Sequence, residues 1–123
     1  MKRTAVIVVV ILLLVILGGK LFINSIVDKA LRVPLRTPDL AALKDGVYEG
    51  SYTLSPVDVE VRVTVKNNRI ETIDILKHEH GFGGPAEQIS DDVLQKQSLD
   101  VDVISGSTVS SKCILKAIET ALH

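Results

Sequence analysis

The sequence predicts an α+β fold in which a small antiparallel β-meander packs against two helices and follows an N-terminal transmembrane helix. Three observations support this prediction. An apolar run opens the 123-residue chain, a middle segment carries apolar residues at every second position, and the last segment carries them at helical spacing. The chain has room for one small domain only. We expect residues 1–24 to form a membrane anchor, residues 25–44 a linker and residues 45–123 the folded domain.

The N-terminal segment is apolar on every side. Its uncharged run over residues 4–19 is interrupted by Lys20 and continues through residues 21–23. This length is typical of a helix that crosses a membrane, because the Lys20 ammonium can reach the interface along its own side chain. Lys2 and Arg3 precede the run as in an export signal, and no small-x-small cleavage pattern follows it. We therefore expect an uncleaved single-pass anchor in the cell membrane, with the C-terminal domain outside the cytoplasm.

Charge is divided unevenly along the chain. Residues 1–36 hold six Lys/Arg against one acidic residue, and the remainder holds eight Lys/Arg against fourteen Asp/Glu. The basic residues after the apolar run favour a C-terminal domain inside the cytoplasm. We nevertheless expect the domain outside, because the basic residues before the run resemble the start of an export signal. An acidic domain without tryptophan lacks the basic face and the stacking platforms of nucleic-acid-binding proteins. We expect no nucleic acid among the partners.

The middle of the chain is expected to form the meander. Residues 47–52 alternate as a first strand, and Val57–Lys66 shows the clearest alternation, with valine at each odd position. Asn67-Asn68 is typical of a tight hairpin turn, and residues 69–77 return as the third strand. Because only one side of these strands is apolar, the other side of the sheet faces water.

A glycine-rich segment with His78, His80 and Phe82 follows the third strand. Two histidines at i, i+2 share one face of an extended segment and could bind a metal together. No further His or Cys lies nearby to complete a zinc site, so we expect no metal. The other interpretations are a flexible loop beside a bound cofactor and an ordinary solvated loop.

Two helices are expected in the last third of the chain. Residues 86–98 follow Pro85 and place their apolar side chains on one side. Residues 99–104 then alternate briefly as a short strand, and residues 111–122 carry apolar positions at helical spacing. Cys113 is the single cysteine and has no partner for a disulfide within the chain. We expect it to be a small, partly buried helix residue.

The turn before the last helix has the composition of a phosphate-binding site. Residues 102–111 read D-V-I-S-G-S-T-V-S-S. Gly106 allows a positive φ or a close backbone approach, and a helix N-terminus offers unpaired N–H groups and the positive end of the dipole to a phosphate. From the residues alone, a plain Ser/Thr N-cap is the alternative and the commoner case.

The pattern D-x-x-S-G-S-T at residues 102–108 resembles the Asp-x-x-Ser/Thr-Gly-Ala-Thr signature of the FMN-binding domain family, with Ser107 where the family usually has alanine. The family includes the flavin-carrying subunits of the sodium-pumping quinone reductase and of the related ferredoxin-linked membrane complex. The order of Asp-Gly-x-Tyr-x-Gly, a valine-rich strand, Asn-Asn-x-Ile and the late motif is also similar. The resemblance spans nearly all of residues 45–122.

The resemblance implies FMN held through a phosphoester on Thr108, transferred from FAD by a dedicated flavin transferase. It implies an electron carrier rather than an enzyme, acting with membrane redox proteins or a quinone-linked complex. Asp102 would assist the transferase step by helping to deprotonate the Thr108 hydroxyl or by holding a metal, and its alternative role is a turn acceptor. The residues expected at the cofactor come from the turn and the glycine-rich loop: Thr108, Ser107, Gly106, Ser105, Val109, Ser110, Asp102, His80 and Phe82.

Two further interpretations stay open at this point. The same fold could bind FMN without a covalent bond, or it could be a flavin-free interaction module of a membrane complex. Retention of flavin after denaturation separates the first from covalent attachment, and flavin absorbance of the purified protein tests the second.

Overall fold

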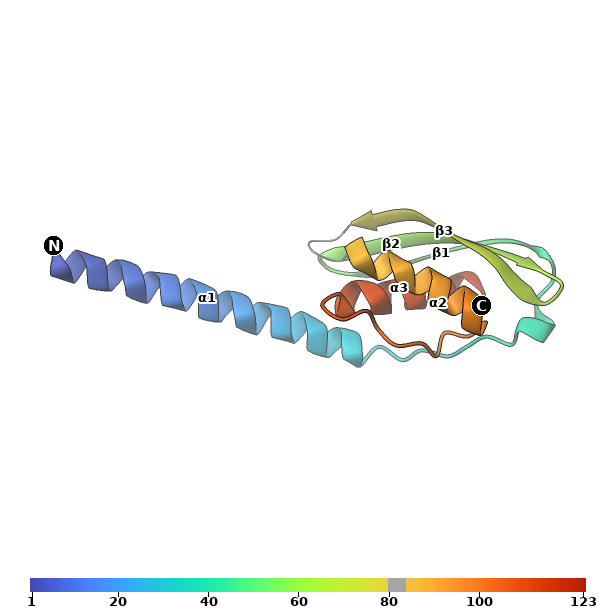
Figure 1. The fold of residues 1–123 in the computed structure, drawn as a ribbon, viewed down its shortest axis with the longest axis horizontal. Coiled ribbons are helices and arrows are strands. Elements are labelled where there is room, and N and C mark those ends of the chain that lie inside the picture. Colours follow the sequence, from blue (N-terminus) through green and yellow to red (C-terminus); the bar gives the residue numbers. More distant parts are fainter. Residues whose placement is uncertain (80–83) are drawn as a thin grey trace.

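The chain folds into a three-stranded antiparallel sheet packed on helices, with a long N-terminal helix leading into it (Figure 1). The structure is a computed structural model and describes residues 1–79 and 84–123. The predicted α+β class, a β-meander with packed helices after an apolar N-terminal helix, is confirmed. The α-helices are α1 (Lys2–Leu31), α2 (Ile89–Lys96) and α3 (Thr108–Ala121), the strands are β1 (Gly46–Leu54), β2 (Val57–Lys66) and β3 (Arg69–Glu79), and the short 3-10 helices are η1 (Leu40–Ala42) and η2 (Gly84–Gln88).

The sheet is a meander in the order β1-β2-β3, and both strand pairs are antiparallel. The odd-numbered valines of β2, residues 57–65, are at most 5% exposed, so they line the covered face. Asn67 and Asn68 have φ values of 53° and 60°, as a two-residue primed hairpin turn requires. The alternation in β2 and the Asn-Asn turn were both predicted correctly.

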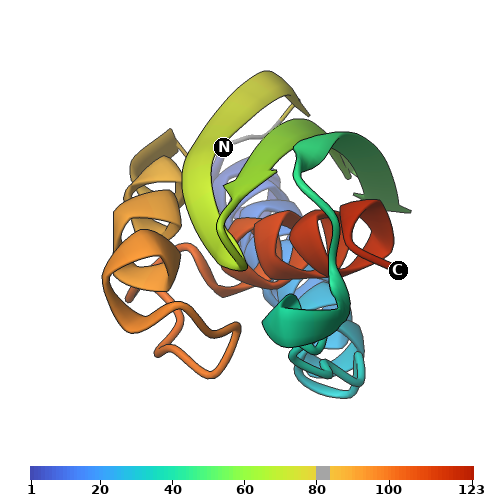
Figure 2. The same cartoon turned by 90° about the vertical axis from the view of Figure 1, so that its right-hand side faces the viewer.

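Helix α3 lies against the covered face of the sheet and supplies the other half of the core (Figure 2). Its Ile114, Leu115 and Ile118 side chains are at most 1% exposed. Burying each such side chain contributes about 1.5–3 kcal/mol. The position of α3 on the sheet is therefore a main determinant of stability in this small domain.

Cys113 lies in α3 with no exposed surface, and burial raises the pKa of its thiol to about 11. The attacking species in alkylation is the thiolate, so we expect iodoacetamide to leave Cys113 unmodified in the folded protein near neutral pH. In denaturant the same thiol should react fully, as followed by intact mass. Rapid labelling under native conditions would contradict the buried position.

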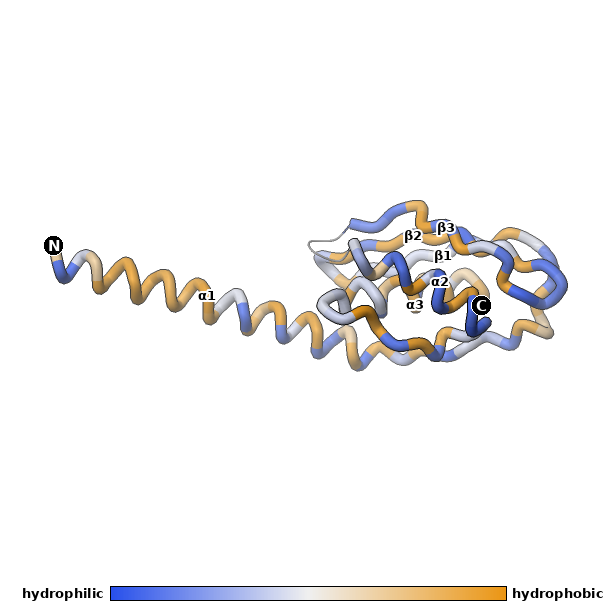
Figure 3. The backbone as a smooth tube through the Cα atoms, in the orientation of Figure 1, coloured by the Kyte–Doolittle hydropathy of each residue, from blue (hydrophilic) through white to orange (hydrophobic). Residues whose placement is uncertain are grey.

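Helix α1 has two parts with different surroundings. The large apolar side chains between Val6 and Ile23 are 47–65% exposed, and Figure 3 shows this stretch as a nearly continuous apolar rod. By length and composition the helix could cross a membrane. Near its C-terminal end the helix contacts α3, with Ile26 and Val27 half-buried and Ala30 fully buried. The helix runs without a break from the apolar rod onto the folded domain.

Gln97 attaches the end of α2 to β3. It closes α2 in the left-handed region with φ of 53°. Its side-chain amide accepts a hydrogen bond from Ile70 N at 2.7 Å and donates to Ile70 O at 3.0 Å and to Leu94 O at 2.7 Å. The Gln97 amide thus pairs with the backbone N–H and C=O of Ile70 in the way that a neighbouring strand would. The same bonds fix the start of the segment that leads to α3.

Two details of the last third differ from the prediction. Residues 99–104 form no strand in the described part of the chain. Their alternation arises because Leu99 is buried and Val101 and Ile104 are half-buried against the core, while Ile104 N–H donates to the Ser111 hydroxyl at 3.0 Å. Helix α3 begins at Thr108 rather than Ser111, so residues 108–111 form the first turn of the helix and the rest of residues 102–111 precedes it.

Candidate functional site

The turn before α3 is closed by backbone bonds and by one buried hydroxyl. Gly106 has a φ of +78°, and Ser107 N–H donates to Ile104 O at 2.9 Å. The Ser111 hydroxyl donates to Ser107 O at 2.7 Å and accepts from Ile104 N–H. Sequence reasoning missed this role of Ser111, because a serine that bonds across a turn has the same sequence signal as an ordinary helix serine.

The hydroxyl groups of the motif differ in exposure. Ser107, Ser110 and Ser111 are at most 6% exposed, whereas Thr108 is half-buried and Ser105 is exposed. Thr108 is the first residue of α3, directly after the N-cap Ser107. Thr108 is therefore the motif hydroxyl that combines access from outside with a place in the first turn of the helix.

A groove of about 400 Å³ lies beside Thr108, between the end of α1 and the motif. It is largely apolar, and none of the described residues that line it carries a charge. A phosphate at its inner end would meet the backbone N–H groups of the first turn of α3 rather than a basic side chain. The residues that line this Thr108 groove are Ile23, Ile26, Val27, Pro56, Val57 and residues 106–110.

His78 links the end of β3 to the first turn of α3. Its side chain is 2% exposed, and its Nε2 lies 2.9 Å from the Ser110 hydroxyl. Its Nδ1 lies 3.7 Å from Glu87 Oε1. The sequence singled out His78 only as one of two conceivable metal ligands, because contacts between residues 32 positions apart leave no local signal. In the structure, the His78 side chain instead connects the end of β3 to Ser110 in the first turn of α3.

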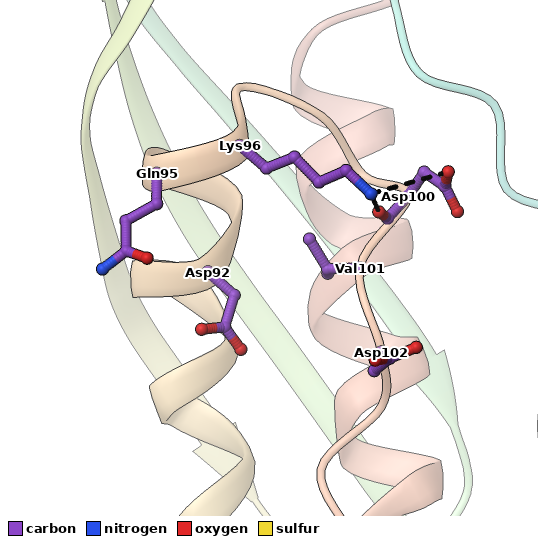
Figure 4. A pocket seen from close by; sticks show the side chains of 6 residues that line it. All are labelled: Asp92, Gln95, Lys96, Asp100, Val101 and Asp102. Atoms are coloured by element: carbon purple, nitrogen blue, oxygen red, sulfur yellow. Dashed lines mark hydrogen bonds and ion pairs between the residues drawn. The ribbon is translucent and has the colours of Figure 1, made fainter.

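Asp102 lies apart from the Thr108 groove. Asp102 lines a separate polar depression between α2 and the segment before α3 (Figure 4). Asp92, Lys96 and Asp100 line the same depression. Lys96 bonds to the Asp100 carbonyl and lies 3.7 Å from its carboxylate. Asp102 itself is exposed. Asp102 thus does not line the Thr108 groove, and its role in the transferase step stays a prediction.

Metal binding finds no geometric support in the described ranges. No group of three or more His, Cys, Asp or Glu side chains lies close enough to hold an ion within residues 1–79 and 84–123. The two remaining predicted contacts, His80 and Phe82, lie outside the described residues. The structure therefore brings together residues 106–110 of the predicted set, and it adds the end of α1, which the sequence did not indicate.

Comparisons with known proteins show which family the chain belongs to. An uncharacterized protein of Treponema pallidum (strain Nichols) is 32% identical over 99 residues, which are 78% of this chain and 28% of that protein. The NADH:acrylate oxidoreductase of Vibrio harveyi is 40% identical over 68 residues, which are 53% of this chain and 7% of that enzyme. The chain thus corresponds to a small part of each of these relatives. The profile of the FMN-binding domain family matches residues 55–123, more than half of the chain and all of α3 and its motif, so the chain belongs to the FMN-binding domain family.

Proposed function

We propose that this chain is a membrane-anchored flavoprotein that carries FMN through a phosphoester on Thr108 and transfers electrons outside the cytoplasm. The observation that carries the proposal is the Thr108 groove, which joins a partly exposed hydroxyl, a helix N-terminus and an apolar wall in one place. Each of the three suits a different part of FMN. The hydroxyl suits the attachment bond, the helix N-terminus suits the phosphate and the apolar wall suits the ring.

The phosphate is held by the backbone in this proposal. The first N–H groups of a helix have no acceptor within the helix, and the dipole adds positive potential there. Helix α3 has 14 residues, long enough for its dipole to act at Thr108. Because the lining residues are uncharged, these N–H groups are the main stabilisation that the groove offers to the phosphate charge.

Attachment joins Thr108 to the flavin phosphate. The Thr108 Oγ–P bond forms, the P–O bond to the AMP part of FAD breaks, AMP leaves, and a base takes the hydroxyl proton. The buried Ser107, Ser110 and Ser111 are less accessible to a transferase. Asp102 is exposed outside the groove, where a docked flavin transferase would meet it. In this proposal Asp102 therefore assists the attachment step only when the flavin transferase is docked.

Bound FMN supplies one- and two-electron transfer, and the chain supplies the site. The residues that line the groove would limit water around a bound ring, and the His78–Ser110 contact holds the first turn of α3 against the end of β3. The matching region makes up 7% of the Vibrio harveyi oxidoreductase. This small share favours a carrier module over a complete catalytic unit, and we propose that the chain passes electrons to and from other membrane redox proteins or a quinone-linked complex.

The membrane anchor in this proposal is the apolar part of α1. A helix of 30 residues is about 45 Å long at 1.5 Å per residue, and a bilayer core is roughly 30 Å thick. The span therefore leaves the C-terminal turns of α1 in water. Lys2 and Arg3 before the apolar run favour an N-terminus in the cytoplasm.

The test is to express the full chain with an active flavin transferase and to recover it from the membrane fraction. We expect an intact-mass increase equal to FMN less one water, and in-gel flavin fluorescence that survives denaturation. Flavin that is released on denaturation would support non-covalent binding instead. If the protein carries no flavin although the co-expressed transferase modifies another target, both forms of flavin binding are excluded. The interpretation as a flavin-free interaction module would then be the one supported.

A further inference from the structure

The end of α1 forms one wall of the Thr108 groove. Ile23, Ile26, Val27 and Ala30 follow the i, i+3, i+4, i+7 spacing that places side chains on one helix face. Ala30, at the far end of this stripe, has no exposed surface, and α1 contacts α3. The other three residues line the groove. One stripe of the helix therefore both docks on the domain and borders the site.

We propose that this stripe covers one face of the flavin ring and holds it at the lipid–water boundary. The proposal rests on the proposed function, because it requires FMN on Thr108. It assigns to the anchor helix a second task, namely binding the cofactor that the domain carries.

The size and chemistry of the groove fit an aromatic ring. Small-molecule sites enclose roughly 300–1,000 Å³ and are lined by apolar side chains with a few polar groups that fix the orientation. The Thr108 groove has about 400 Å³, apolar side chains from α1 and β2, and polar groups from the motif at one end. A ring attached at Thr108 that turned away from this groove would leave its apolar wall in water, which is unfavourable.

The depth of the flavin ring relative to the membrane follows from the sequence of α1. Ile23 ends the apolar run, and Asn24 and Ser25 are the first consecutive polar residues after it. A wall that begins at Ile23 therefore lies where the span leaves the hydrocarbon core. At this level the ring is within reach of a membrane-embedded redox partner or a lipid-soluble carrier, whereas a ring on a flexible tether would not be held there.

Tryptophan substitution provides the test, because the chain contains no tryptophan and an indole in contact with a flavin quenches its emission by electron transfer. Ile23 is 60% exposed, so Ile23→Trp requires no repacking of the core, and tryptophan is favourable at a membrane interface. Ser25→Trp is the matched control, since Ser25 is exposed on the opposite face of α1 at the same depth.

Both variants and the wild type are expressed with the transferase and compared in liposomes at equal flavin content, as determined by intact mass. We expect Ile23→Trp to lose most of the flavin emission and Ser25→Trp to retain that of the wild type. Equal emission from the two variants would overturn the proposed wall while the mass increase still supported the proposed function. Absence of the mass increase from the wild type would overturn the proposed function and this inference together.

A second measurement needs no substitution. Lipids that carry a nitroxide close to the headgroup quench fluorophores at that depth, and iodide quenches those open to water. We expect strong quenching of the wild-type flavin by the lipid nitroxide and weak quenching by iodide. The reverse order would place the ring in solvent and contradict the proposal.

Discussion

Replacing Thr108 with alanine is expected to abolish the covalent flavin completely. The substitution removes the one motif hydroxyl that is both accessible and next to the groove, whereas Ser107 and Ser110 are at most 6% exposed. The fold should remain, because Thr108 is the first helical residue and not the N-cap, and changes away from caps and cores usually alter the free energy of unfolding by less than about 1 kcal/mol. Intact mass and in-gel flavin fluorescence measure the loss, and thermal unfolding checks the fold.

Two further variants separate chemistry from structure in this experiment. Thr120→Ala removes a threonine hydroxyl from the exposed far end of the same helix, where it donates to Lys116 O at 2.9 Å, and should carry flavin as the wild type does. Thr108→Ser keeps an acceptor hydroxyl and should restore the mass increase. If Thr108→Ala still carried the increase, peptide mapping to Ser105 or Ser107 would move the attachment point and refute Thr108 as the acceptor.

The parts of the fold that the sequence predicted are those with a regular period. The alternating valines of β2 are buried at every odd position, and Asn67-Asn68 adopts the two positive φ values of a tight turn. These features depend on neighbouring residues, so their signal is local. Residues 99–104 show the limit of such patterns. The alternation of residues 99–104 reflects the burial of one side of the segment. Burial of one side does not show that a neighbouring strand is present to form hydrogen bonds with it.

The start of α3 could not be located from periodicity. Its first buried large apolar residue is Ile114, and the preceding serines and threonine are weak helix formers. The helix begins earlier because Gly106 turns the chain at positive φ and the Ser111 hydroxyl bonds across the turn. The predicted phosphate site thus includes the first turn of the helix as well as the turn before it, and Thr108 lies at the positive end of the helix dipole.

The contribution of α1 to the site was hidden for a different reason. Ile23, Ile26 and Val27 belong to or adjoin an almost uniformly apolar run, and such a run has no polar side from which a binding face could be inferred. The contact between His78 and Ser110 was hidden because it joins two elements through the tertiary fold. The motif residues could be recognised from the sequence, but the walls and supports around them depend on how α1, β3 and α3 pack.

Gly50→Ala is the stability change with the largest expected effect. Gly50 lies on β1 where α3 crosses the strand, and an added Cβ would be 2.8 Å from Ala121 Cα and closer still to Ala121 N and Ala117 O. These are backbone atoms, so no side-chain rotation can relieve the clash. Helix and strand must move apart, and overpacking of this kind typically costs about 1–3 kcal/mol. For a domain of this size, each kcal/mol lowers the melting temperature by about 4–8 °C.

Gly46→Ala on the same strand is the matched control, since its Cβ would meet only the Tyr48 ring at an ordinary 3.9 Å. Alkylation of Cys113 in increasing denaturant reports unfolding of the domain, because the single thiol lies under the sheet in α3. We expect Gly50→Ala to become reactive at clearly lower denaturant than Gly46→Ala and the wild type. Equal midpoints for the two variants would show that α3 does not approach β1 closely at Gly50. Because α3 carries Thr108 at its other end, a real displacement should also reduce flavin attachment in Gly50→Ala, which would connect the packing of a glycine on the sheet to the cofactor site.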